Sequence, residues 1–106
     1  LFLSLVNWPF FYSPSSDEWA TESYIKGQFT KLKNRFVSDG YPVVIGEYGA
    51  SEYSGSEYKD QSSRVNWTTL VCSCAKSSKC VPVWWDNGYG FSLFNRSAGT
   101  VYNEKK

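Results

Sequence analysis

The chain has 106 residues, enough for one domain, with 42% hydrophobic residues and a formal net charge of +1. Its Lys and Arg residues are scattered, which argues against nucleic acid as a partner, because such binding needs a basic stripe. No apolar run is long enough to cross a bilayer, so we expect no membrane insertion. The sequence contains no His, which excludes Ser-His and Cys-His nucleophile pairs and most patterns of metal ligands. Acid-base chemistry would then depend on carboxylates, Tyr, Lys or Cys.

Three apolar runs separated by two helical patterns predict the order strand, helix, strand, helix, strand and then a tail. The runs are Leu1–Val6, Val43–Ile45 and Val81–Trp85. Their continuity is typical of strands that are buried on both faces of a parallel sheet. Alternation of strands and helices predicts parallel pairing through right-handed crossovers.

Each helical pattern has one apolar face and a recognisable end. In the first, Ile25, Phe29, Leu32 and Phe36 recur at helical spacing, and Gly40 stands where a helix C-cap is expected. The second pattern has an apolar face and two candidates for its N-cap, Asp60 and Ser62. The residues of that second face are Trp67, Leu70, Val71 and Cys74.

The cysteines are odd in number: Cys72, Cys74 and Cys80. One reading makes them small buried residues, which we favour for at least one of them. In the other, Cys80 forms a disulfide with Cys72 or Cys74, and the remaining thiol pairs elsewhere in a secreted protein. Three cysteines without His are poor evidence for zinc.

Aromatic and polar side chains follow each predicted strand, where parallel α/β folds bind their ligands. The first run precedes Phe10-Phe11-Tyr12, the second ends in Gly46-Glu47-Tyr48-Gly49, and the third ends in Trp84-Trp85-Asp86-Asn87. Glu47 reads equally as a positioned carboxylate at the floor of a cleft or as an exposed turn residue. Alternation sends Trp84 and Trp85 to opposite faces, so one can pack while the other lines the cleft. A Trp beside a carboxylate suits a sugar site, because the ring stacks on a pyranose.

These motifs resemble glycoside hydrolase family 5, the cellulases and related β-glucanases on a (β/α)8 barrel. The resemblance rests on "PVVIGEYGAS", on "VPVWWDNGYG" and on flanking segments that together cover most of the chain. It implies that Glu47 is the nucleophile of a retaining endo-β-1,4-glucanase and that Trp85 stacks on the sugar at the cleavage point. Tyr12 matches a Tyr that supports the nucleophile. Asp86 and Asn87 match a substrate-contacting loop, and Trp84 is a further candidate for substrate binding.

Two departures from the family pattern bear on activity. The family's His before the supporting Tyr is replaced by Phe10, and its acid/base motif, Asn-Glu-Pro, is absent; Asn103-Glu104 is followed by Lys105. Retaining hydrolysis needs two carboxyl groups about 5–5.5 Å apart. Of the carboxylates in this chain, Asp86 is the best alternative acid by position.

The resemblance implies that residues 1–106 are one segment, the carboxyl-terminal part of a catalytic barrel. The barrel takes roughly 250 residues, so the chain would supply about the last three βα units, strands 6 to 8. The implied partners are β-glucan and the missing amino-terminal part of the barrel. The implied setting is extracellular, as a secreted protein, and no metal or organic cofactor is needed. Two alternatives stay open: a non-catalytic fragment that binds carbohydrate through surface aromatics, and a purely structural role for Glu47 and the rings.

Overall fold

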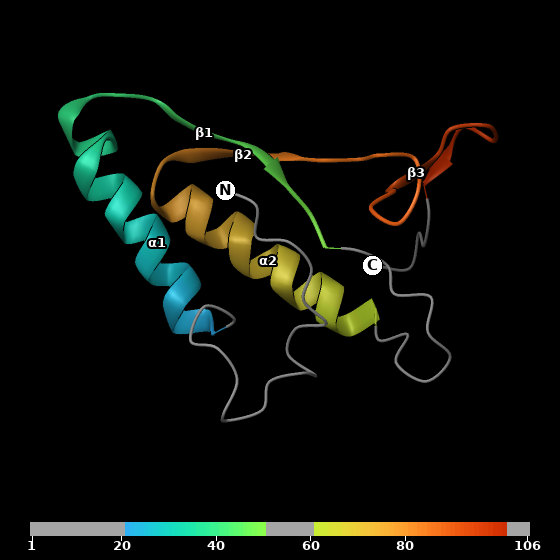
Figure 1. Ribbon diagram of the computed structural model, residues 1–106, viewed down its shortest axis with the longest axis horizontal. Coiled ribbons are helices and arrows are strands. Elements are labelled where there is room, and N and C mark those ends of the chain that lie inside the picture. Colours follow the sequence, from blue (N-terminus) through green and yellow to red (C-terminus); the bar gives the residue numbers. More distant parts are fainter. Residues whose placement is uncertain (1–20, 51–60, 102–106) are drawn as a thin grey trace.

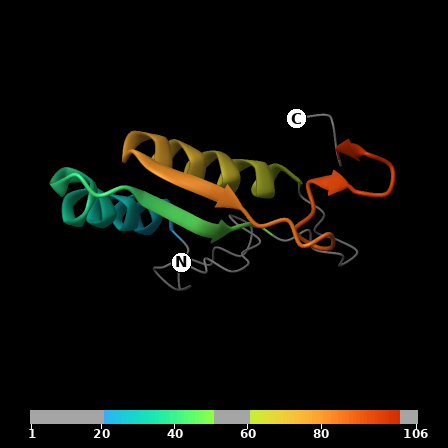
Figure 2. The same cartoon turned by 90° about the horizontal axis from the view of Figure 1, so that it is seen from above.

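A computed structural model describes residues 21–50 and 61–101 of the chain. Two helices, α1 (Glu22–Arg35) and α2 (Gln61–Ser77), lie on one side of a two-stranded sheet made of β1 (Val43–Tyr48) and β2 (Cys80–Trp84) (Figure 1). A short hairpin lies beyond the end of β2, away from α1 (Figure 2). The first expected strand and the aromatic cluster after it, including Tyr12, fall outside the described residues.

Helix α1 forms where the apolar spacing predicts it. The hydroxyl of Thr21 caps the helix by accepting a hydrogen bond from the Tyr24 N–H at 3.0 Å. Ile25 and Phe29 are buried and Leu32 is half-buried. Phe36, expected on the same face, is instead 42% exposed, because the α-helix ends at Arg35 and the backbone changes direction there.

A 3-10 helix, η2 (Val37–Asp39), separates α1 from β1. Gly40 follows it with φ of 87°, so the expected glycine cap closes this short helix rather than α1 itself. The Gly40 N–H donates to the Val37 carbonyl at 3.0 Å, and the chain then enters β1 through Pro42.

Helix α2 packs against the sheet through the predicted face. Trp67, Val71 and Cys74 are buried, and Leu70 is half-buried against the same core. The helix begins at Gln61, which places Ser62 inside it rather than at the N-cap, while Asp60 falls outside the described residues. No described helix has the length and apolar character needed to cross a membrane.

All three cysteines are free thiols. Cys74 and Cys80 are buried, as small apolar residues of a core are, and this burial raises the pKa of both thiols. Cys72 is half-buried and lies 3.2 Å from the hydroxyl oxygen of Tyr48. The reading as small buried residues is therefore confirmed for Cys74 on α2, and Cys80 is buried as the first residue of β2.

The strands confirm the predicted parallel strand-helix-strand unit. Val43, Val44 and Ile45 pair with Cys80, Val81 and Pro82, and Tyr48 pairs with Trp84. The two strands differ slightly from the predicted runs, since β1 continues to Tyr48 and β2 starts one residue earlier, at Cys80.

The expectation that these strands are buried on both faces is wrong for the part of the chain that the structure describes. The helix side of the sheet is packed, but Val44 is 60% exposed and its partner Val81 is 57% exposed. Val83 is also exposed. The reason is that both described helices cover the same face, which leaves an apolar open face on the other side.

The predicted tail contains a hairpin that the sequence reading missed. Strands β3 (Phe94–Asn95) and β4 (Thr100–Val101) pair antiparallel around a turn in which Gly99 has φ of 66°. The Asn95 side chain accepts a hydrogen bond from the Ala98 N–H and stabilises this turn. Strands of two residues are too short to show an alternating pattern.

Candidate functional site

Glu47 reaches the open face of the sheet because of an irregularity in β1. Ile45 pairs with Pro82 and Tyr48 with Trp84, so two residues of β1, Gly46 and Glu47, lie opposite one residue of β2. Such a bulge re-aims side chains. With regular alternation from the buried Ile45, Glu47 would face the helices; with the extra residue, Tyr48 faces them and Glu47 is exposed. Within the described ranges, its carboxylate makes no hydrogen bond or ion pair.

Tyr48 anchors the strand immediately after Glu47. Its ring is buried between two indoles, with centroid distances of 6.1 Å to Trp67 and 5.3 Å to Trp84, the latter edge to face. Its hydroxyl contacts the Cys72 sulfur, and burial raises the pKa of Tyr48 well above its usual value. The carboxylate of Glu47 is thus carried by a backbone that is fixed from the helix side.

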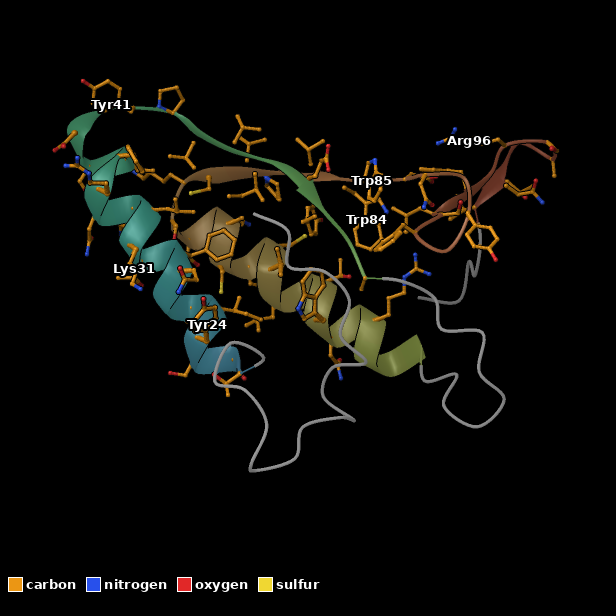
Figure 3. The ribbon with its side chains drawn as sticks, viewed as in Figure 1. Tyr24, Lys31, Tyr41, Trp84, Trp85 and Arg96 are labelled. Carbon is orange, nitrogen blue, oxygen red and sulfur yellow. The ribbon has the colours of Figure 1, made fainter. Side chains whose placement is uncertain are left out.

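Trp84 and Trp85 occupy opposite sides of the sheet, as alternation predicts (Figure 3). Trp84 belongs to the helix side, where its ring packs on Tyr48 and under the Arg64 guanidinium at 5.4 Å. Trp85 is 41% exposed, and its backbone N–H donates to the Tyr48 carbonyl at 2.9 Å. The structure therefore places the Trp85 backbone beside the Tyr48-Gly49 peptide, one residue after Glu47, and leaves Trp84 as a packing residue on the helix side.

Asp86 organises the loop that follows β2. One carboxylate oxygen accepts the Leu93 N–H at 2.9 Å and the Phe94 N–H at 3.3 Å, and the other accepts the Gly88 N–H at 2.8 Å. Arg96 adds a charge-assisted hydrogen bond at 3.1 Å. These backbone donors, with the smaller effect of Arg96, lower the pKa of Asp86 to about 2.

Asn87 also serves the loop. Its side-chain oxygen accepts the Tyr89 N–H at 2.9 Å and the Phe91 N–H at 3.2 Å. Tyr89 at the tip is 85% exposed. The side chains of Asp86 and Asn87, predicted to contact substrate, are thus committed through their oxygens to holding the shape of the loop between β2 and β3.

Sequence reasoning missed Phe91, which connects the loop to both strands. Its ring lies 5.4 Å from the Trp85 ring, and its carbonyl accepts the Trp84 indole N–H at 2.9 Å. A side-chain carbon added at Gly49 would lie only 2.8 Å from a Phe91 ring carbon. Gly49 is therefore needed for close packing of Phe91, whereas Gly46 has no atom within 4 Å of such a carbon.

The structure brings two of the predicted site residues, Glu47 and Trp85, to one open face at the carboxyl ends of adjacent parallel strands. Asp86 and Asn87 follow in the loop that supports that end, and Trp84 lies on the opposite face. Tyr12 falls outside the described residues. Within residues 21–50 and 61–101, no group of three or more side chains is arranged to hold a metal ion.

Comparison with known proteins identifies relatives over most of the chain. The family model described as Cellulase (glycosyl hydrolase family 5) matches residues 5–90. Endoglucanase A of Paenibacillus barcinonensis is 41% identical over 87 residues, which cover 78% of this chain and 22% of that protein. A xyloglucan-specific endo-beta-1,4-glucanase of Bacteroides ovatus is 34% identical over 74 residues, or 66% of this chain and 15% of that protein. The chain therefore spans about a fifth of the length of these curated relatives.

Solved structures of the same family share the fold. A family 5 xyloglucanase from Paenibacillus pabuli superposes with a TM-score of 0.76 at 40% identity, covering 86% of this chain and 27% of that chain. A broad-specificity GH5-4 endoglucanase from Bacteroides salanitronis gives a TM-score of 0.72 at 31% identity, covering 88% of this chain and 26% of that chain.

These matches confirm the resemblance inferred from the G-E-Y-G and W-W-D-N-G motifs, and with it the relation to glycoside hydrolases. They also imply the fold class, a (β/α)8-barrel family, with which the parallel β1–α2–β2 unit is consistent. The chain belongs to glycosyl hydrolase family 5, the family of the cellulases.

Proposed function

We propose that this chain carries the nucleophile of a retaining endo-β-1,4-glucanase, and that the nucleophile is Glu47. The observation that carries the proposal is that Glu47 and Trp85 share the open face at the carboxyl ends of β1 and β2. Active sites of (β/α)8 barrels are built at this end of the strands. A carboxylate with no hydrogen-bond partner among the described residues is available to attack the anomeric carbon.

In the proposed reaction, Glu47 attacks the anomeric carbon and forms a covalent glycosyl-enzyme, which water then hydrolyses. The leaving oxygen takes its proton from a second carboxyl group about 5–5.5 Å away. Asp86 is unsuited to that role, because a pKa of about 2 keeps it ionised and its two oxygens are already hydrogen-bonded. We assign the acid/base to a segment of the barrel other than the described residues.

Trp85 is the proposed sugar platform. Its exposed indole, on the same open face as Glu47, offers the flat surface on which a glucosyl ring stacks. Tyr12 and Asn87 remain secondary candidates for contacts to Glu47 or to substrate. Trp84 acts, in this proposal, through packing. The relatives named as endoglucanases and xyloglucanases support a polymeric β-glucan as the substrate class.

The wider assignments follow from the same family membership. We propose that residues 1–106 form one segment of the catalytic domain and contribute its last three βα units, with the remaining units as their partner. We further propose that the enzyme acts outside the cell, since a β-glucan polymer is too large to enter one. The hydrolysis requires no metal or organic cofactor, because carboxyl groups and water suffice.

The test is the release of reducing sugar from carboxymethylcellulose by the catalytic domain that contains this chain. We expect Glu47→Gln to lower the rate by about 10³-fold or more while the domain stays folded. Glu22→Gln is the matched control, since Glu22 is an exposed carboxylate on α1 that pairs with Lys26. Full activity of Glu47→Gln would overturn the assignment of the nucleophile.

One observation favours a second function, glycan binding without cleavage. Among the described residues, Glu47 is the carboxylate on the open face with Trp85 that makes no hydrogen bond or ion pair, whereas both oxygens of Asp86 are hydrogen-bonded. The described residues therefore supply one of the two carboxyl groups that hydrolysis needs. A binding function predicts that affinity for cellotetraose survives Glu47→Gln and is lost in Trp85→Ala. Loss of hydrolysis in Glu47→Gln, measured as above, would reject this alternative.

A further inference from the structure

We propose that Phe91 is a positioning residue that fixes the orientation of the Trp85 indole. The absence of a side chain at Gly49 leaves the space that the Phe91 ring occupies. The proposal rests on the proposed function in one respect, the role of Trp85 as a sugar platform. Phe91 itself need not touch the substrate. It acts by supporting the ring that does.

The Phe91 ring is held between the two strand ends. On one side it packs against the Trp85 indole, with ring centroids 5.4 Å apart and planes inclined by 41°. The ring also lies close to Gly49, where an added side-chain carbon would be 2.8 Å from Cδ1 of the ring. Real side chains do not approach so closely, so any residue other than glycine would displace Phe91 or the strand.

The backbone of Phe91 is fixed by side chains at both of its polar groups. Asn87 accepts its N–H at 3.2 Å, and the Trp84 indole N–H donates to its carbonyl at 2.9 Å. The next carbonyl, of Ser92, accepts a hydrogen bond from Arg64 on α2 at 3.0 Å. The two consecutive tryptophans therefore both act on Phe91, one through its backbone and the other through its ring.

This support matters because Trp85 is 41% exposed on an open face. An exposed indole without a neighbouring ring has several staggered orientations, and the substrate would have to select one of them on binding. A ring pair of this geometry contributes about as much as a tenfold change in an equilibrium constant at most. We therefore expect loss of Phe91 to weaken glucan binding about three- to tenfold.

The experiment is fluorine NMR of the catalytic domain that contains this chain, labelled with fluorotryptophan, in which Trp85→Phe assigns the Trp85 resonance. Phe91→Leu should shift and broaden that resonance, because the ring current and the restraint are both lost. Phe91→Tyr keeps the ring and should restore the wild-type position. Phe94→Leu is the matched control, since Phe94 is an exposed ring on β3, and it should leave the resonance unchanged.

Gly49→Ala is the second variant, and it leaves both the Phe91 and the Trp85 side chains unsubstituted. It should shift the Trp85 resonance by displacing Phe91, while the buried Trp67 resonance shows that the chain remains folded. If Phe91→Leu fails to fold, Gly49→Ala decides. An unchanged Trp85 resonance in a folded Phe91→Leu or Gly49→Ala chain overturns the proposal.

Titration with cellotetraose separates this proposal from the proposed function. If Phe91→Leu moves the Trp85 resonance and weakens binding three- to tenfold, both hold. If the variant moves the resonance but cellotetraose never perturbs Trp85 in the wild-type domain, Phe91 positions Trp85 and the role of Trp85 as a sugar platform fails. If the variant moves the resonance but binds cellotetraose as tightly as the wild-type domain, Phe91 positions Trp85 and the expected three- to tenfold loss of affinity is wrong.

Discussion

The two faces of the β1–β2 sheet differ in what they contact. The helix face carries Ile45, Tyr48 and Cys80, which are buried against α1 and α2. The open face carries Val44, Val81 and Val83, which are exposed, together with Glu47 and Trp85. In a (β/α)8 barrel such alternation separates residues that face the helices from those that face the barrel interior. The helix face therefore determines local stability, and the open face carries the proposed chemistry.

The bulge in β1 connects these two functions. It turns Tyr48 into the helix face, where it packs between two indoles, and turns the preceding residue, Glu47, to the open face. Removing a contact on the helix face should therefore lower stability, whereas removing a side chain on the open face should mainly affect sugar binding or hydrolysis. Matched substitutions on the two faces test this division.

The largest contrast is expected between the adjacent tryptophans. Trp84→Ala should lower the free energy of unfolding by about 3 kcal/mol, because it removes the ring packed on Tyr48 and the donor to the Phe91 carbonyl. Trp85→Ala should cost about 1 kcal/mol or less. Urea unfolding followed by circular dichroism measures both. Equal losses would contradict the division between the faces.

A second pair compares valines of the two faces. Val71 on α2 is 1% exposed, and Val71→Ala should cost about 2–3 kcal/mol from lost burial and the cavity left behind. Val44→Ala, on the open face, should change stability by less than about 0.5 kcal/mol in the chain alone. If thermal unfolding shows a large loss for Val44→Ala, another segment must cover the open face.

Tyr48→Phe removes the hydroxyl beside Cys72 and should cost about 0.5–1.5 kcal/mol at neutral pH. The pKa of Tyr48 is raised mainly by burial, so Tyr48 loses its proton at a higher pH in the folded state than in the unfolded state, where the pKa of Tyr is about 10. Wild-type stability should therefore fall as pH rises above about 10, relative to Tyr48→Phe. Denaturant unfolding at pH 8 and pH 11 checks this, and a parallel pH dependence in both chains would count against it.

The smallest global effect is expected for Asp86, because its contacts stay within the loop after β2. Backbone N–H groups, first that of Leu93, lower its pKa to about 2, whereas an unfolded Asp titrates near 3.9. Its contribution is present above pH 4 and lost as pH falls through 2. The amide proton shifts of Leu93 and Phe94 should titrate with a midpoint near 2, and these shifts should not titrate in Asp86→Asn. A midpoint near 4 would contradict the observed hydrogen bonds.

The sequence predicted the strand-helix-strand unit because its signals are local. The apolar run from Val43, the helical face around Val71 and the run to Trp84 each lie within one element, and their order implies parallel pairing. Other features depend on contacts between elements. The exposure of Val44 follows from both helices covering one face, and the β3–β4 hairpin is too short to leave a pattern.

For the site, residue types predicted the position of Glu47 and Trp85 at strand ends but not their geometry. A bulge is a register shift between strands, so Ile45 and Tyr48 had to be paired with β2 before the direction of Glu47 followed. The role of Phe91 was not visible either, because five residues lie between it and Trp85 and its contacts come from three different segments.

Covalent trapping tests the central claim, the orientation of Glu47 toward the sugar on the open face. The active catalytic domain containing this chain would be treated with a 2-fluoro cellobioside, which slows hydrolysis of a glycosyl-enzyme, and the tryptic peptide 36–59 would be fragmented in a mass spectrometer. We predict a glycosyl adduct on the carboxylate of Glu47. An adduct on a different carboxylate, with Glu47 unmodified, would contradict the account.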